Sequence, residues 1–128
     1  MGMYTQIRGF LNIGDDKNAE ERYLKTAKKF KEENEGRTYV ADYFRCVDGR
    51  NTTWILIGIE HKDYDDSIDV FLHYLFEEFK SLEGRIEKQR EAVNDITEVY
   101  IIKDSEIVEQ YEEESTFRGN FNFANNKD

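Results

Sequence analysis

The sequence predicts an α+β fold, an antiparallel sheet with two helices packed on it, in the order β-α-β-β-α-β-β. Three observations lead to this prediction. Apolar residues alternate at period two near the N-terminus, they recur at helical spacing in two longer segments, and an Asp-Gly turn joins two strand-like segments. A chain of 128 residues suits one core. We expect residues 1–114 to form this single domain, with 115–128 as a loosely ordered tail or an edge strand.

The first strand and the first helix are predicted from the spacing of apolar residues. Strand alternation places four residues on one side: Ile7, Gly9, Leu11 and Ile13. After the turn "GDDKN", the steps of four, four and three that a helix requires join a second set: Ala19, Tyr23, Ala27 and Phe30. Gly36 follows as a residue that can end this helix.

Two further strands are predicted in "TYVADYFRC" and "TTWILIGIE", joined by the turn "VDGRN". The second of them is apolar on both faces, from Trp54 to Ile59. This pattern predicts a central strand that is covered by a helix on one face and by further structure on the other.

The second helix begins near Ile68, with Asp65 or Asp66 as its N-cap. Its apolar positions are Ile68, Phe71, Leu72, Leu75, Phe76, Phe79 and Leu82. Residues 85–92 fit either an extension of this helix or a polar edge strand. The last segment, residues 96–114, is predicted to form a hairpin that turns near Asp104-Ser105. Its inward residues are predicted to be Val99, Ile101, Ile107 and Tyr111.

The junction between the central strand and the second helix holds both histidines within residues 57–79 and five acidic residues within residues 60–69. "DYDD" lacks the Gly and the donor spacing of a calcium loop, and zinc would need more His or Cys ligands than the chain offers. Cys46 lies in an apolar strand, where thiols are inert. We therefore expect no metal, no cofactor and no catalytic residue, and His61 is the better functional candidate of the two histidines.

The charge of the chain indicates a basic partner. The net charge is −10, and all of it lies in residues 61–128. Such a surface disfavours nucleic acid and anionic membranes, and it favours a basic protein. The alternative is that the charge only maintains solubility. The predicted binding residues are acids of the junction and of the last hairpin, with tyrosines and one histidine among them: Glu60, His61, Asp63, Tyr64, Asp65, Asp66, Glu109, Tyr111 and Glu112.

The chain also resembles the immunity proteins of bacterial polymorphic toxin systems, specifically the family numbered seven. The segment "RGFLNI" is similar to the Gly-Trp start of that family, with Phe10 in place of Trp. "GIEHKDYDDSIDVFLHYL" is similar to its Gly-x-x-His-basic motif before a helix, through Gly58, His61 and Lys62, with Glu60 where Asn is usual. The hairpin "VYIIKDSEIVEQ" also has a counterpart, whereas the Pro-containing ending is absent. The resemblance implies a cytosolic, non-enzymatic inhibitor that binds a cognate toxin.

The sequence thus predicts a cytoplasmic, non-enzymatic inhibitor that neutralises a basic toxin through an acidic surface. A single cysteine and the lack of an apolar N-terminal run fit a reducing compartment. Two alternatives stay open: a phage-encoded acidic protein that blocks a defence factor, and a small ligand-binding or enzymatic domain centred on His61. A protein partner is expected, with no nucleic acid or membrane, and the chain itself as a monomer or a homodimer.

Overall fold

The computed structural model describes residues 4–14, 16–62, 67–91 and 96–114, which form one six-stranded antiparallel sheet and its covering helices. The fold is therefore α+β, as the sequence predicts. In chain order the elements are β1 (Tyr4–Gly14), α1 (Ala19–Glu33), the 3₁₀ helix η1 (Thr38–Tyr43), β2 (Phe44–Asp48), β3 (Thr53–Lys62), α2 (Ser67–Glu78), β4 (Glu83–Arg90), β5 (Ile96–Lys103) and β6 (Glu106–Glu114).

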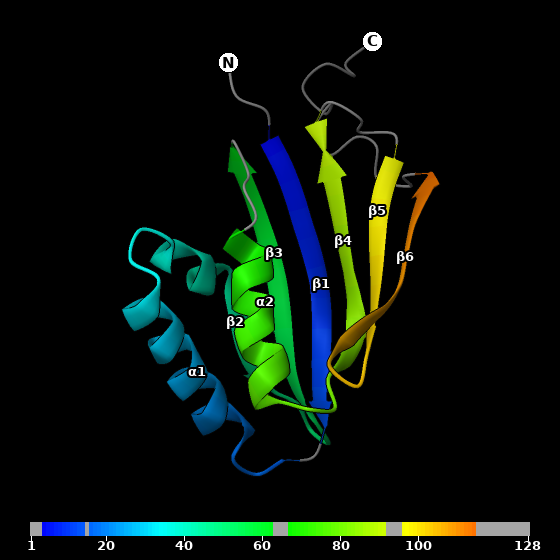
Figure 1. The fold of residues 1–128 in the computed structure, drawn as a ribbon. Coiled ribbons are helices and arrows are strands. Elements are labelled where there is room, and N and C mark those ends of the chain that lie inside the picture. The colour runs from blue at the N-terminus through cyan, green and yellow to red at the C-terminus, as the bar shows by residue number, and fades with distance from the viewer. Residues whose placement is uncertain (1–3, 15, 63–66, 92–95, 115–128) are drawn as a thin grey trace.

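The sheet has the strand order β2-β3-β1-β4-β5-β6 (Figure 1). The first strand of the chain thus lies in the interior of the sheet, where it pairs with β3 on one side and β4 on the other. Its residue Gly9 is opposite both Ile57 and Ile86. Strands β5 and β6 extend the sheet beyond β4, so β2 and β6 are its two edges within the described chain.

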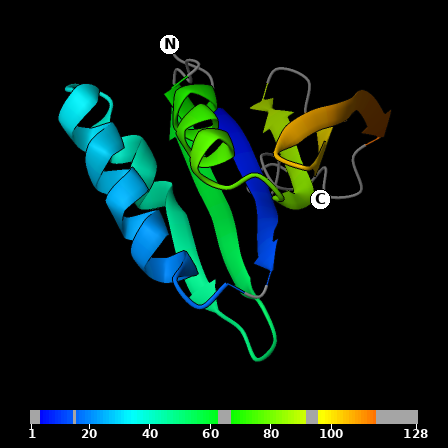
Figure 2. The same cartoon turned by 60° about the horizontal axis from the view of Figure 1, so that its bottom comes forward.

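Both α-helices lie on one face of the sheet, over β2, β3 and β1 (Figures 1 and 2). The alternation predicted for the first strand is confirmed, because Ile7, Leu11 and Ile13 are buried. The helical spacings are confirmed as well. In α1, Ala19, Tyr23 and Phe30 are buried and Ala27 is partly buried. In α2 and the loop after it, all the predicted positions are buried except Phe76, which is partly buried.

Two predictions about strands are corrected by the structure. The segment from Thr38 does not start as a strand, because residues Thr38–Tyr43 form η1 and β2 begins only at Phe44. In η1, Val40 and Ala41 are buried, so their apolar character reflects a helical turn packed on the core. Of the two alternatives for residues 85–92, the strand is confirmed for residues 85–90, which belong to β4. This strand lies inside the sheet and not at its edge, so the sheet has six strands rather than the five predicted. Pairing with β1 and β5 on both sides overrides the helix propensity of "RIEKQR".

The inward face predicted for the last hairpin is only partly right. Tyr100 and Ile102 lie on the side of the helices, with Ile102 buried, whereas Ile107 is 48% exposed. Val99 is fully buried, but it lies on the opposite face. A register shift between Ile101 and Ile102 leaves Val108 as an extra residue in β6. This bulge changes which residues of β6 share a face, and period-two reasoning cannot detect it.

The hairpin turn lies at Asp104-Ser105, as predicted, and both residues have positive φ, as type I′ turns require. Ser105 also joins this turn to the loop after α2. The Leu82 N–H donates to Ser105 Oγ at 3.0 Å, the Ser105 N–H donates to the Leu82 carbonyl at 3.1 Å, and the Ser105 hydroxyl donates to the Phe79 carbonyl. The buried serine therefore provides hydrogen-bond partners for backbone groups of this loop, which is not paired with any strand of the described chain.

Ser105→Ala is expected to destabilise the protein by about 2 kcal/mol, because it leaves the Leu82 N–H and the Phe79 carbonyl without a buried partner. Chemical denaturation of both proteins measures the difference. The matched control is Asp104→Asn in the exposed half of the same turn. Asn accepts positive φ as well as Asp does, so this change should stay within about 0.5 kcal/mol. Equal stabilities of Ser105→Ala and the parent protein would contradict the prediction.

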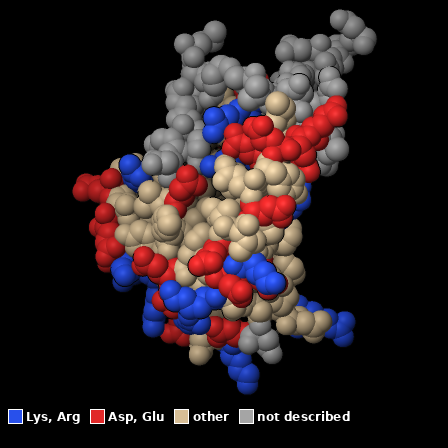
Figure 3. Space-filling model, turned by 45° about the vertical axis from the view of Figure 1, so that its right-hand side comes forward, with Lys and Arg blue, Asp and Glu red and all other residues tan. Residues whose placement is uncertain are grey.

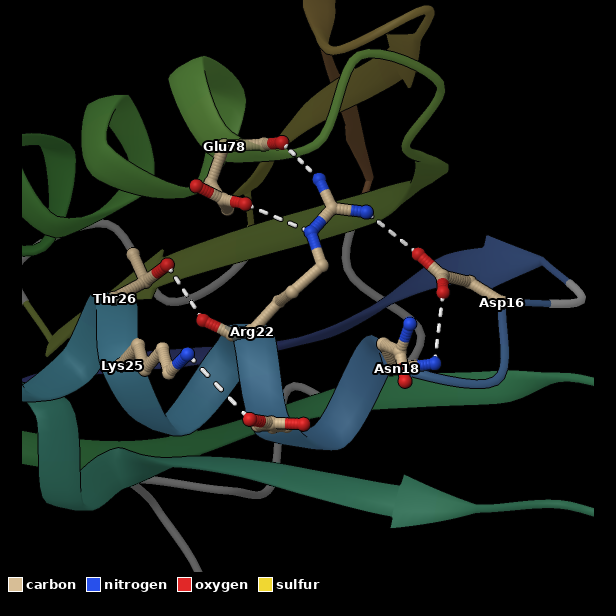
Figure 4. A network of polar contacts seen from close by, with 7 residues as sticks. Asp16, Asn18, Arg22, Lys25, Thr26 and Glu78 are labelled. Atoms are coloured by element: carbon tan, nitrogen blue, oxygen red, sulfur yellow. Dashed lines mark hydrogen bonds and ion pairs between the residues drawn. The ribbon is translucent and has the colours of Figure 1, made fainter.

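Arg22 holds α1 to α2 and to the segment after β1 (Figure 4). Its guanidinium donates to Asp16 Oδ2 at 2.6 Å, to Glu78 Oε2 at 2.7 Å and to the Glu78 carbonyl. The hydrogen bond to Glu78 raises the pKa of Arg22 further, which keeps the side chain charged. The other carboxylate oxygen of Asp16 accepts the Asn18 N–H at 2.9 Å, at the start of α1. This network closes one end of the helical layer.

Candidate functional site

The strand β6 forms an acidic edge of the sheet. Its nine residues include five glutamates and no basic residue. All of them are exposed except Tyr111, which is partly buried. Figure 3, in which this side of the molecule comes forward, shows acidic side chains gathered toward the upper part of the side. The glutamates, which we call the β6 acidic edge, are Glu106, Glu109, Glu112, Glu113 and Glu114.

Most of these carboxylates are not neutralised by basic side chains of the described ranges. Glu113 is the exception, since Arg85 Nη2 lies 2.7 Å from its Oε1. Arg85 also contacts Glu87 at 2.8 Å and donates to the Tyr111 hydroxyl at 3.2 Å. The other four glutamates make no ion pair with any residue that the structure describes. The edge therefore keeps a negative field that reaches solvent.

Several other acids of the second half of the sequence are paired. Glu98 lies 3.5 Å from Arg90 and accepts the Tyr100 hydroxyl at 2.8 Å. Burial and this bond to Glu98 raise the pKa of Tyr100, so it stays a neutral donor. At the start of α2, Asp69 is 3.6 Å from the ammonium of Lys88. Glu77, Glu83, Glu91 and Asp104 also lack an ion pair among the described residues, but they are spread over α2, the two ends of β4 and the last turn, whereas β6 holds four such acids within nine residues.

The predicted binding residues divide between the two faces of the sheet. Residues opposite one another in the register share a face. Glu60, Glu109 and Tyr111 lie on the face without helices, whereas His61 and Glu112 lie on the helical side. Glu60 belongs to β3, which is four strand spacings, about 19 Å, from β6. The structure therefore does not bring Glu60 next to the acids of the last hairpin. Four predicted residues lie outside the described ranges: Asp63, Tyr64, Asp65 and Asp66.

His61 packs in an aromatic corner near the end of β3. Its ring stacks on Tyr39 at a centroid distance of 5.2 Å and meets the edge of Tyr43 at 6.4 Å. The buried Nδ1 has no hydrogen-bond partner within the described residues. These neighbours are rings of η1, with no carboxylate or thiol ligand set. Across the described residues, no group of three His, Cys, Asp or Glu side chains is placed to hold a metal ion.

Cys46, the other candidate for chemistry, faces the helical side of β2. Burial raises the pKa of its thiol, and neighbouring acids raise it further. A raised pKa keeps the thiol protonated at neutral pH and unreactive as a nucleophile. His73 is exposed on α2 beside Phe76. Neither residue forms a catalytic pair with His61 in the described chain.

The sheet face without helices has two different halves. Near Glu60 it carries a polar network, in which Gln6 donates to Glu60 at 2.9 Å and Arg8 contacts Gln89 and Glu87. The other half is apolar and is centred on Phe10, whose ring meets Trp54 edge-on at 5.6 Å. Phe10 and its cross-strand partner Leu56 are 40% and 43% exposed.

The sequence predicts further cover on this side of β3, and no helix of the described ranges supplies it. Phe10, Leu56 and Trp54 are not among the binding residues that the sequence predicts. The sequence does contain a signal for this exposed apolar surface. The central strand is apolar on both faces, whereas the two predicted helices can cover only one face of the sheet.

A scan of protein-family models found no match to this chain, and neither did searches of curated proteins and solved structures. Function is therefore argued from the surface described above. Within the described ranges, neither helix is long and apolar enough to cross a bilayer.

Proposed function

We propose that this protein is a non-enzymatic inhibitor of the immunity type, which binds a basic toxin and neutralises it through the β6 acidic edge. One observation carries the proposal: four glutamates of β6 are exposed and have no ion pair within the described chain. Single unpaired acids are common on protein surfaces, but a cluster of them on one edge strand with no basic residue among them produces a negative field that a basic protein can recognise. The four glutamates of β6 form such a cluster and are available to a partner.

A basic partner suits this surface physically. Proteins that grip phosphate, such as nucleases, carry clusters of Lys and Arg, and an acidic strand can occupy such a cluster. Opposite charges also steer the two proteins together and raise the association rate. Tyr111 lies among the glutamates and supplies aromatic contact area of the kind found in protein interfaces. The resemblance of residues 4–112 to toxin immunity proteins favours the same function and an intracellular site of action.

The enzymatic alternative centred on His61 has less support. A general base needs a partner that orients it and a substrate within reach. The described neighbours of His61 are the rings of Tyr39 and Tyr43, and its buried Nδ1 meets no orienting group among the described residues. The phage-encoded alternative predicts the same acidic surface with a defence factor as target. A toxin gene directly upstream would favour the immunity function, and neighbouring phage structural genes would favour the other.

Reversing charge on β6 is expected to slow association with the partner. The partner is first identified by pull-down from the native host and mass spectrometry, and then tested by co-expression for loss of toxicity. In the double variant Glu109→Lys/Glu112→Lys, we expect association to slow about tenfold at low salt and the difference to shrink at high salt. Surface plasmon resonance at several ionic strengths measures both effects.

The matched control is Glu32→Lys/Glu35→Lys, at the end of α1 and just after it, where both side chains are exposed. Both double variants change the net charge by the same amount, so they differ only in where the charge lies. Equal slowing in the two variants would show that net charge alone governs association. Unchanged association and unchanged neutralisation in the β6 variant would refute the proposed function.

A further inference from the structure

The strand β6 is an edge with one side of its backbone unpaired by any described strand. It pairs with β5 alone and ends the sheet order. In Figure 1 no described element lies beyond it. The backbone N–H and C=O groups on the outer side of an edge strand form a template for another extended chain. A partner strand can therefore add to the sheet at this position.

The bulge at Val108 defines which part of the edge is regular. From Glu109 to Glu114 the pairing with β5 continues without a register shift, over Ile101 to Ile96. Six residues of extended chain span about 20 Å, which is enough for a short added strand. Glutamates point to both faces of this segment, with Glu109 and Glu113 on the helix-free side and Glu112 and Glu114 on the other.

The charge of this segment selects the kind of strand that can pair. Side chains directly opposite in an antiparallel pair are about 5 Å apart, where like charges destabilise and opposite charges stabilise. Two copies of β6 paired with one another would bring glutamates against glutamates, since five of nine residues are Glu. A second copy of the chain is therefore a poor occupant, whereas a strand rich in Lys or Arg meets a carboxylate on either face.

We propose that β6 binds its partner by strand addition, with Glu109–Glu114 pairing with an extended basic segment of the toxin. The inference rests on the proposed function for the identity of the partner and adds how that partner is held. Backbone hydrogen bonds supply affinity, and the glutamates on both faces supply selectivity for Lys and Arg. The rival explanation is that the acids serve only to keep edges of different molecules apart. That explanation predicts no strand addition by any peptide.

A synthetic peptide in which Lys and Thr alternate provides a direct probe. Fluorescence anisotropy of the labelled peptide measures its affinity, and hydrogen exchange followed by NMR measures protection of the β6 amides. We expect binding that weakens with salt, together with slower exchange of amides in Glu109–Glu114. A peptide with Glu in place of Lys serves as the charge control and should not bind. No binding of the Lys-Thr peptide at millimolar concentration would overturn the proposal.

A second peptide separates strand addition from charge attraction. It has the same sequence, with N-methyl groups on two consecutive central residues, so that a methyl blocks each edge of the strand while every charge is kept. Strand addition predicts that this peptide binds at least about tenfold more weakly. Equal affinity of the two peptides would overturn strand addition. The outcome of the neutralisation assay with the natural partner does not depend on that result. Failure of this inference is therefore distinguishable from failure of the proposed function.

Discussion

Replacing Gly84 with Ala is expected to cause a severe loss of stability, the largest of any single substitution considered for this protein. A Cβ at position 84 would lie 1.9 Å from the Phe10 carbonyl oxygen and 2.9 Å from Leu11 Cα. Both atoms belong to the backbone of β1, which is paired on both sides and cannot move away from β4 without losing its pairing with β3. Relief of this overlap therefore requires the central pairing to separate. We expect a loss of more than about 4 kcal/mol, from a total stability of about 5–15 kcal/mol.

The matched control is Gly58→Ala in β3. Its Cβ would have no heavy atom within 4 Å, and the residue is exposed on the helix-free face. Ala restricts the unfolded chain more than Gly does, so this variant should be unchanged or more stable by up to about 1 kcal/mol. Circular dichroism and urea denaturation of both variants measure the difference. A cooperative, stable Gly84→Ala protein would contradict the close approach of β1 and β4.

The parts of the fold that the sequence predicts are those with a local signal. The stripe from Ala19 to Phe30 and the apolar face around Phe71 follow from helical spacing within one element. The turn at Asp104-Ser105 follows from residue types that accept positive φ. In each case the residues that carry the pattern are close in sequence, so the packing partner need not be known.

The parts that the sequence does not predict depend on pairing between distant segments. β4 has helix formers from Arg85 to Arg90, and its strand form comes from β1 and β5 on either side. The expected merger of the acids near Glu60 with those of the last hairpin fails for a similar reason. β1, β4 and β5 lie between β3 and β6, an order that no local pattern encodes. The acidity of residues 106–114 was visible in the sequence, whereas their position on a free edge was not.

Truncation of Phe71 is expected to give the largest loss of stability among the core side chains. Phe71 is fully buried in α2 and lies 4.8 Å from the ring of Phe30 and 4.7 Å from that of Phe44, measured between centroids. It thus joins α1, α2 and β2 in one cluster. Phe71→Ala removes these contacts and leaves a cavity that rings held by three elements cannot fill, so we expect a cost of about 3–5 kcal/mol.

Phe10→Ala removes the same side chain from the opposite face of the sheet. Because Phe10 is 40% exposed and has Trp54 as its aromatic contact, we expect this variant to lose less than about 1.5 kcal/mol. Urea denaturation of the two variants compares them directly, with the emission of Trp54, the single tryptophan, as an added readout for Phe10→Ala. Similar losses of stability in the two variants would mean that side chains on the helix-free face are buried to the same extent as those on the helical face. A large difference means that burial against the helices provides most of the stability of the fold. The residues of the helix-free face and of the β6 edge can then differ from one partner to another without loss of the fold.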